Sequence, residues 1–308
     1  MPQTSRWTRR QFLRAVLANP EKTSHSAATP IGRFFRQNIR PIPTLNAAYW
    51  SFSVGGLVRH PLVWSYGDVL ALPSVEVPCA IACIGNKPGG EWIGNAVWQG
   101  TPLPALLDEL AILPGARYAR LLAADHYRTS VPLERLQGAL LVYGMNGETL
   151  PPEHGFPARL IVPGLYGYKM PKWIERIELT DTPAGGVWEQ RGWSAEGIVQ
   201  TTSAILSPRS KETVRGTVRF SGMAYAGERT IVAVELSIDG APWMPAPFTP
   251  AVDVGWTSWR IEWTPPGPGD YQARVRATDS DGLTQPEIGA AFPNGASGQH
   301  AIVIRVVE

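Results

Sequence analysis

Two cysteines, and the loop that follows the second of them, are the residues most able to do chemistry in this chain. Cys79 and Cys83 lie in a mostly apolar run from Val77 to Ile84 that ends at Gly85-Asn86. Such a run predicts a buried strand that ends in a turn. Cys83 would then lie where a rigid strand opens into a Gly-rich loop, and loops held in this way often carry functional groups.

A disulfide between these two cysteines is not expected. Residues four apart on a strand lie about 13 Å apart at ~3.3 Å per residue, whereas bridged cysteines need Cα atoms within roughly 7 Å. Most free cysteines act as small buried hydrophobic residues, and this interpretation suits Cys79. For Cys83 the polar loop that follows leaves a chemical role and a packing role equally open.

The bulk composition excludes several classes of protein. A chain of 308 residues is long enough for two domains with their own cores. The net charge of +2 gives no bulk electrostatic support for a nucleic-acid partner. With only two cysteines, the chain is not a scaffold held together by disulfides. No stretch approaches the ~20 apolar residues of a transmembrane segment. The 31 glycines and 29 prolines predict many loops and much β-structure.

The N-terminal 30 residues combine a basic run with a Ser/Thr/Ala-rich stretch. Thr8 to Leu13 resembles the start of a twin-arginine export signal, but the apolar segment that should follow is reduced to Ala15 to Ala18. We expect a periplasmic location if this start is functional and a cytoplasmic one if it is not. Residues 1–30 are predicted to form a mobile N-terminal segment.

The sequence around Cys83 resembles a motif of the sulfite oxidase family of molybdenum-molybdopterin enzymes. The resemblance rests on Cys83-Ile-Gly-Asn86 and on the run Val-Trp-Gln-Gly-Thr-Pro-Leu at residues 97–103. In that family the cysteine of the Cys-x-Gly-Asn run is the thiolate ligand of molybdenum. The resemblance therefore implies that Cys83 binds the metal, and a soft thiolate suits a metal that must stay bound through redox cycling.

Three cations lie on loops that are punctuated by glycines: His154, Arg159 and Lys172. Such loops let backbone N–H groups approach an anion, and an arginine fork matches the geometry of phosphate. By itself the cluster is weak evidence, because cations near turns are common on protein surfaces. Residues 140–173, however, are similar to the longest family motif nearly position for position. The resemblance implies that these side chains hold the phosphate end of the pterin.

Two more contacts to the cofactor are implied by the resemblance. Asn38 lies in a segment, residues 34–43, that resembles the family segment wrapped around the cofactor, although Gln37 and Ile39 replace its arginine and histidine. Asp125 follows a predicted strand and resembles an aspartate that hydrogen-bonds the pterin. An aspartate at a strand end is also a common turn residue, so both roles stay open for Asp125.

The substrate side departs from the family pattern. Gln37 and Pro88 stand where the family has anion-binding arginines, and Trp193 or Ser194 stands where it has a tyrosine that faces molybdenum. A desolvated sulfite needs positive partners, so this pocket is expected to be less cationic and more aromatic than a sulfite site. The candidate catalytic residues are Cys83, Trp193 and Lys87.

The predicted fold is an α+β molybdopterin-binding domain of sulfite oxidase type followed by an all-β immunoglobulin-like sandwich. Strands are predicted at 49–58, 118–124 and 173–179, with a helix over 102–113 and another introduced by residues 129–132. Short alternating segments at 214–220, 231–238, 256–263, 271–277 and 301–307 predict the sandwich. The expected domains are residues 31–195 and 196–308. The second resembles the family's dimerisation domain, which implies a homodimer.

The family resemblance implies a Mo-molybdopterin-dependent oxidoreductase that transfers an oxygen atom in a two-electron reaction on a small substrate, with sulfite as one candidate. The chain contains no Cys-x-x-Cys-His run for a c-type haem. Electrons would therefore pass through a separate redox partner such as a cytochrome. Two alternatives stay open: a reductase of an oxidised substrate that uses the same cofactor, and a cofactor-free binding or structural module on a decayed scaffold.

Overall fold

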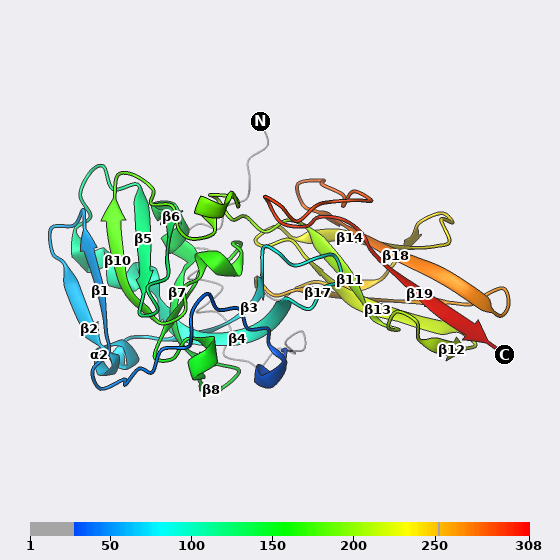
Figure 1. The fold of residues 1–308 in the computed structure, drawn as a ribbon, viewed down its shortest axis with the longest axis horizontal. Coiled ribbons are helices and arrows are strands. Elements are labelled where there is room, and N and C mark those ends of the chain that lie inside the picture. The colour runs from blue at the N-terminus through cyan, green and yellow to red at the C-terminus, as the bar shows by residue number, and fades with distance from the viewer. Residues whose placement is uncertain (1–27, 252) are drawn as a thin grey trace.

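The computed structural model describes residues 28–251 and 253–308. Figure 1 shows two lobes side by side, with strands β1 to β10 in one and β11 to β19 in an elongated second lobe that carries the C-terminus. The run from Thr8 to Leu13 that resembles an export signal lies outside the described residues, as does nearly all of the predicted N-terminal segment.

The first lobe contains a mixed five-stranded sheet in the order β2-β1-β10-β5-β6, in which β1 and β10 are parallel. On β5 the buried residues are Ala119, Leu121 and Ala123. This alternation means that one face of the sheet covers the core. The strands are β1 (Ser51–Gly56), β2 (Leu62–Ser65), β5 (Tyr118–Ala123), β6 (Arg128–Pro132) and β10 (Ile174–Thr180).

A second sheet, in the order β3-β4-β7-β8 with β9 also paired to β7, carries the cysteines. Every residue of β7 is buried, as expected for a central strand covered on both faces. Strand β3 ends at Ala82, so Cys83 begins the loop, as the sequence predicts. The strands are β3 (Val75–Ala82), β4 (Ile93–Pro102), β7 (Leu140–Met145), β8 (Glu148–Thr149) and β9 (Arg159–Ile161).

The helices of this lobe are short. The helix predicted over 102–113 is α3 (Leu103–Leu107) followed by the 3-10 turn η2 (Asp108–Leu110), and it ends where Ala111 adopts a left-handed conformation. Residues 129–132 themselves lie on β6, because Thr and Val suit a strand paired with β5. The helix that they were predicted to introduce follows directly as the 3-10 helix η3 (Leu133–Gly138). The others are α2 (Tyr66–Ala71), η1 (Ile31–Arg33), η4 (Pro152–His154), η5 (Gly167–Lys169) and η6 (Glu189–Arg191).

The second lobe is a sandwich of two sheets, β11-β13-β17-β16 and β12-β19-β18-β14-β15. The strand predicted over 214–220 is in fact two strands in different sheets. Gly216, with φ of 62°, lies between them and lets the chain cross from one sheet to the other. The strands are β11 (Thr202–Ser207), β12 (Thr213–Arg215), β13 (Val218–Tyr225), β14 (Ile231–Ile238), β15 (Met244–Pro245), β16 (Phe248–Thr249), β17 (Thr257–Trp263), β18 (Gly269–Asp279) and β19 (His300–Val307).

The two lobes meet at strand β3, which leads into Cys83. The N–H of Ala80 donates to the carbonyl of Val254 at 3.1 Å, and the buried Tyr225 hydroxyl donates to the carbonyl of Ala80 at 2.9 Å. The sandwich therefore satisfies backbone groups of the strand that positions the loop cysteine.

Candidate active site

A cavity of about 280 Å³ opens beside the end of strand β3 in the first lobe. Its volume lies near the lower end of the range for small-molecule sites. Among the residues that the sequence singled out, those that line the cavity are Asn38, Cys83, Asp125, His154, Arg159, Lys172 and Trp193. Lys87 does not line the cavity: it is exposed on the neighbouring loop, away from its expected place beside the substrate.

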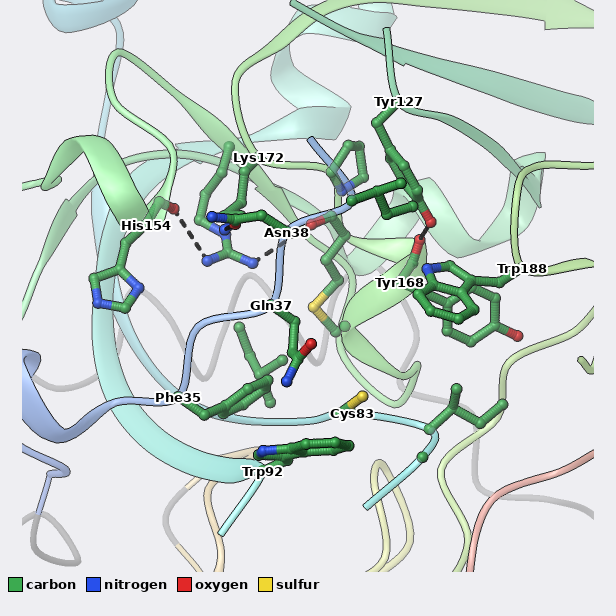
Figure 2. A pocket seen from close by; sticks show the side chains of 18 of the residues that line it. Phe35, Gln37, Asn38, Cys83, Trp92, Tyr127, His154, Tyr168, Lys172 and Trp188 are labelled. Atoms are coloured by element: carbon green, nitrogen blue, oxygen red, sulfur yellow. Dashed lines mark hydrogen bonds between the residues drawn. The ribbon is translucent and has the colours of Figure 1, made fainter. Parts of the chain in front are cut away.

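Cys83 presents its thiol to this cavity. Its N–H donates to the carbonyl of Trp92 at 2.9 Å, and its own carbonyl accepts from the N–H of Asn86 at 3.0 Å. Figure 2 shows the sulfur facing the space beside Trp92 and Gln37. Cys79, by contrast, is completely buried in the core outside the cavity. Both thiols are free, as the four-residue spacing predicts.

Burial raises the pKa of the Cys83 thiol above its ordinary value. The thiol is therefore protonated near pH 7 in the metal-free protein, and a metal would have to displace that proton. Within the described residues no group of three or more His, Cys, Asp or Glu side chains could hold a metal ion. A metal bound at Cys83 would thus take most of its ligands from an organic cofactor.

Arg159, at the start of β9, is a buried guanidinium that has no counter-charge among the described residues. The residue is only 5% exposed and lies 5.0 Å from the Trp98 ring centroid. Its Nη atoms donate to the carbonyls of His154 at 3.1 Å and Met170 at 3.4 Å. Within the described residues its Nε has no partner and no carboxylate pairs with it.

Burial lowers the pKa of Arg159 to about 10, so the group stays charged at neutral pH. An uncompensated buried charge costs several kcal/mol. The unpaired Arg159 charge therefore favours an anion at this end of the cavity. A phosphate matches the N–H donors of the guanidinium.

Lys172 adds a second cation beside Arg159. Its Nζ donates to the side-chain oxygen of Asn38 and, at 3.0 Å, to the carbonyl of Glu153. Burial, and then the neighbouring Arg159, lower the pKa of Lys172 to about 7. The Lys172 ammonium therefore titrates near neutral pH, and a bound anion would favour the charged form.

His154 and Asp125 complete the predicted cofactor contacts. Burial, and then Arg159, lower the pKa of His154 to about 4, so its ring is neutral at pH 7 and can act only through hydrogen bonds. Asp125 lines the cavity, while its Oδ1 accepts from the N–H of Tyr127 at 3.0 Å. This residue therefore closes a turn and faces the cavity at once.

Much of the remaining wall is aromatic, and most of these side chains were not singled out from the sequence. They come from segments far apart in the chain, so no spacing could have joined them. Trp193 lines the cavity and Ser194 does not; the Ser194 hydroxyl accepts from the N–H groups of Glu196 and Gly197. The aromatic wall comprises Phe34, Phe35, Trp92, Tyr127, Tyr168, Trp173, Trp188 and Trp193.

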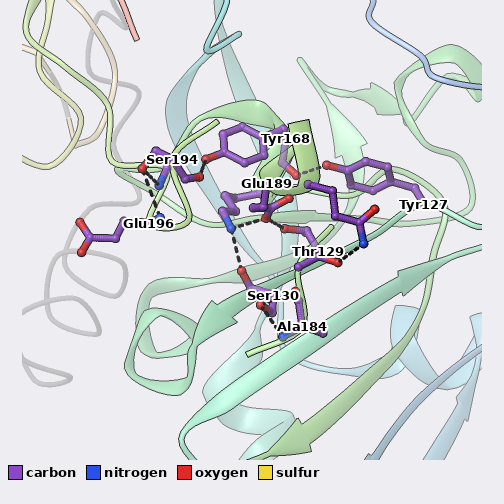
Figure 3. Close-up of polar contacts among 12 residues, drawn as sticks. Tyr127, Thr129, Ser130, Tyr168, Ala184, Glu189, Ser194 and Glu196 are labelled. Atoms are coloured by element: carbon purple, nitrogen blue, oxygen red, sulfur yellow. Dashed lines mark hydrogen bonds and ion pairs between the residues drawn. The ribbon is translucent and has the colours of Figure 1, made fainter. Parts of the chain in front are cut away.

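A buried ion pair between Lys169 and Glu189, which the sequence did not predict, holds part of the aromatic wall in place (Figure 3). Lys169 Nζ lies 2.5 Å from Glu189 Oε1 and donates to the carbonyl of Ser130 at 2.9 Å. The Thr129 hydroxyl donates to the same Glu189 oxygen at 2.5 Å. Glu189 begins η6, between Trp188 and Trp193, so the pair ties the segment that carries both tryptophans to strand β6.

Replacing one partner of this ion pair is expected to destabilise the protein strongly. Lys169 is 1% and Glu189 9% exposed, so Lys169→Met or Glu189→Leu leaves an unpaired buried charge at a cost of about 3–5 kcal/mol. The double variant should lose less than the sum, with a coupling energy of roughly 1–3 kcal/mol. Denaturant unfolding of the four proteins measures this coupling, and strictly additive losses would contradict it.

Comparisons with known proteins agree with this geometry. Residues 39–188 match the family model described as "Oxidoreductase molybdopterin binding domain". Sulfite oxidase of Arabidopsis thaliana is 30% identical over 279 residues, which cover 73% of this chain and 71% of that protein. The chain belongs to the sulfite oxidase family of molybdopterin oxidoreductases. It is accordingly an oxidoreductase, and its cofactor is Mo-molybdopterin.

Two further comparisons show how much of the chain the likeness covers. Mitochondrial sulfite oxidase of Macaca fascicularis is 29% identical over 89% of this chain, which spans only 60% of that protein. The crystal structure of the sulfane dehydrogenase SoxCD from Paracoccus pantotrophus superposes with a TM-score of 0.79 at 25% identity and covers 92% of this chain and 85% of that one. The predicted fold class is thus confirmed over both lobes.

Proposed function

We propose that this chain holds Mo-molybdopterin in the cavity, with Cys83 as the protein ligand of molybdenum and Arg159 at the phosphate end. The observation that carries the proposal is the pairing of a free thiol with a buried, uncompensated guanidinium in one cavity. A cofactor with a metal at one end and a phosphate at the other would satisfy both groups. Lys172, His154, Asn38 and Asp125 would supply the remaining cofactor contacts.

When bound, the cofactor supplies two-electron redox chemistry and oxygen-atom transfer on a small substrate. The protein residues bind and orient the cofactor and shape the space beside the metal ligand. The Lys172 charge and the Arg159 fork fix the phosphate end, and Asn38 places its amide against Lys172. Trp193 and the other aromatic side chains exclude water from the reacting end.

The remaining parts of the system are also proposals. Electrons would pass to or from a separate redox protein such as a cytochrome. The sandwich, residues 196–308, would form a homodimer, and residues 31–195 would form the catalytic domain. Among the described residues no helix is long and apolar enough to cross a membrane.

Elemental analysis of the purified protein, with fluorescence detection of released pterin, tests the proposal. Expression in a host that makes the cofactor should give nearly one molybdenum and one pterin per chain. Absence of both would contradict the proposal and favour a cofactor-free binding module. The buried Arg159 charge argues against that alternative, since an empty site gains nothing from it.

Cofactor retention is expected to weaken as the pH rises above 7. A bound phosphate favours charged Lys172 and so raises its pKa from about 7. Above pH 7 the complex then binds more protons than the free protein, and the affinity should fall about tenfold per pH unit until the pKa of the complex is reached. In the cofactor-free protein Arg159 and Arg36 lower the Lys172 pKa, and Asp125 and Glu153 raise it.

Dialysis of the loaded protein at pH 7, 8 and 9, followed by pterin fluorescence, measures this retention. Lys172→Met removes the titrating group and should flatten the pH profile while lowering retention throughout. A wild-type profile that is flat, or that rises with pH, would rule out a role for Lys172 in holding the phosphate.

A further inference from the structure

We infer that the substrate of this site is an uncharged molecule with apolar substituents on its reactive sulfur or nitrogen, rather than sulfite or another small oxyanion. The inference rests on the proposed function, because it concerns the space left beside Cys83 once the cofactor is bound. It follows from where the cavity has cations and where it has aromatic rings.

The cations that line the cavity, within the described residues, are Arg159 and Lys172. Figure 2 shows Lys172, with His154 and Asn38, gathered on one side of the cavity and Cys83 with Trp92 on another. A phosphate at the first side would take up both charges. The exposed Lys87 does not line the cavity.

The wall beside Cys83 offers rings and one neutral amide. Trp92 lies beside the thiol, and the Gln37 side chain reaches into the space between Phe35 and Cys83 (Figure 2). Trp193 also lines the cavity, and its ring packs edge-on against Phe292 of the sandwich lobe with 5.2 Å between the ring centroids.

These surroundings favour one charge class of substrate. A small dianion would lose its hydration here without gaining a cationic partner, and desolvating an unpaired charge is far more costly than burying a neutral group. An apolar or aromatic substituent, in contrast, gains about 25 cal/mol for each Å² of surface removed from water. Ring stacking on the tryptophans would add to this gain.

For a sulfide the balanced reaction is R–S–R′ + H₂O → R–S(=O)–R′ + 2 H⁺ + 2 e⁻. The sulfur lone pair forms the new S–O bond, the oxygen comes from water, and the two electrons leave to a one-electron redox protein. The reverse reaction breaks the S–O bond and releases the oxygen as water. Gln37 can donate its amide N–H to the substrate oxygen without adding charge.

Steady-state kinetics on the molybdenum-loaded protein test the inference. Methyl phenyl sulfide and sulfite are compared as reductants of ferricyanide, and methyl phenyl sulfoxide as an oxidant of reduced methyl viologen. We expect kcat/KM for the sulfide or the sulfoxide to exceed that for sulfite by about 10- to 100-fold, the cost of one missing charged hydrogen bond. A kcat/KM for sulfite equal to or above both would overturn the inference.

Ligand-observed saturation-transfer NMR gives a readout that does not depend on turnover. The phenyl protons of the sulfoxide should receive saturation from the loaded protein, and excess sulfate should not displace the ligand. Loss of the signal with sulfate, or no signal at all, would overturn the inference. If the purified protein contains neither molybdenum nor pterin, the proposed function fails. If it contains both but the kinetics or the NMR give the contrary result, only the substrate inference fails.

A gain-of-charge variant sharpens the comparison. Gln37→Arg puts a guanidinium on the wall beside Cys83 and should lower the KM for sulfite about 10- to 100-fold, the range for a charge-assisted hydrogen bond. The same change should not lower the KM for the sulfoxide. Gln137→Arg, at an exposed position outside the cavity, adds the same net charge and should leave both KM values unchanged. Equal effects of the two variants on sulfite would contradict the inference.

Discussion

Cys83→Ser is expected to abolish turnover while the protein keeps its pterin. The thiol at the end of β3 faces the cavity and would be the protein's ligand to molybdenum. A serine hydroxyl is a harder and far less acidic ligand, so the loss should exceed the roughly 10–100-fold that follows loss of a group outside the ligand shell. Pterin should stay bound, since Arg159 and Lys172 hold its other end. Activity, molybdenum and pterin are measured on the same preparation.

Cys79→Ala is the matched control for this prediction. Cys79 lies on the same strand but is completely buried outside the cavity, and burial raises its thiol pKa to about 12. Its loss should lower the free energy of unfolding by about 1 kcal/mol, as for other small core truncations. Turnover per molybdenum should not change. Wild-type molybdenum content in Cys83→Ser, or lost turnover in Cys79→Ala, would exclude Cys83 as the sole protein ligand.

Arg159→Met is expected to change stability and cofactor retention in opposite directions. In the cofactor-free protein the guanidinium is buried beside Trp98 with an unpartnered Nε, so an apolar side chain of similar length should leave the melting temperature unchanged or raise it. Cofactor retention should fall at least about 10- to 100-fold, because charge-assisted hydrogen bonds to the phosphate are lost. A thermal melt and a pterin assay measure the two effects.

Arg159→Lys separates charge from geometry at this position. A lysine keeps the positive charge but not the planar fork that matches phosphate, so retention should lie between those of wild type and Arg159→Met. Reduced stability of the cofactor-free Arg159→Met protein together with unchanged retention would show that the guanidinium serves packing rather than anion binding.

Local sequence determined the parts of the fold that depend on near neighbours in the chain. The apolar run that ends at Gly85-Asn86 predicted both strand β3 and the position of Cys83 at its end. Asn146 and Gly147, residues that readily take positive φ, form the turn between β7 and β8. The spacing of the two cysteines excluded a disulfide. In each case the controlling interaction lies within a few residues.

Strand pairing decided details that the local pattern did not show. Residues 129–132 lie on strand β6 because the preceding strand β5 offers hydrogen-bond partners along their length. The segment 214–220 divided at Gly216 because its two halves pair with different sheets. Propensity within a short window carries no information about such partners.

Both the local sequence and the tertiary structure determine the character of the site. The order of motifs along the chain identified the family, and with it the residues to examine around the cofactor. Only the folded protein shows that Arg159 is buried with no counter-charge among the described residues, and that Lys87 is exposed and does not line the cavity. The aromatic wall likewise forms only when distant segments meet, held in part by the Lys169–Glu189 pair. Burial and charge compensation are properties of the packed structure, so tertiary contacts decided which chemistry the cavity favours.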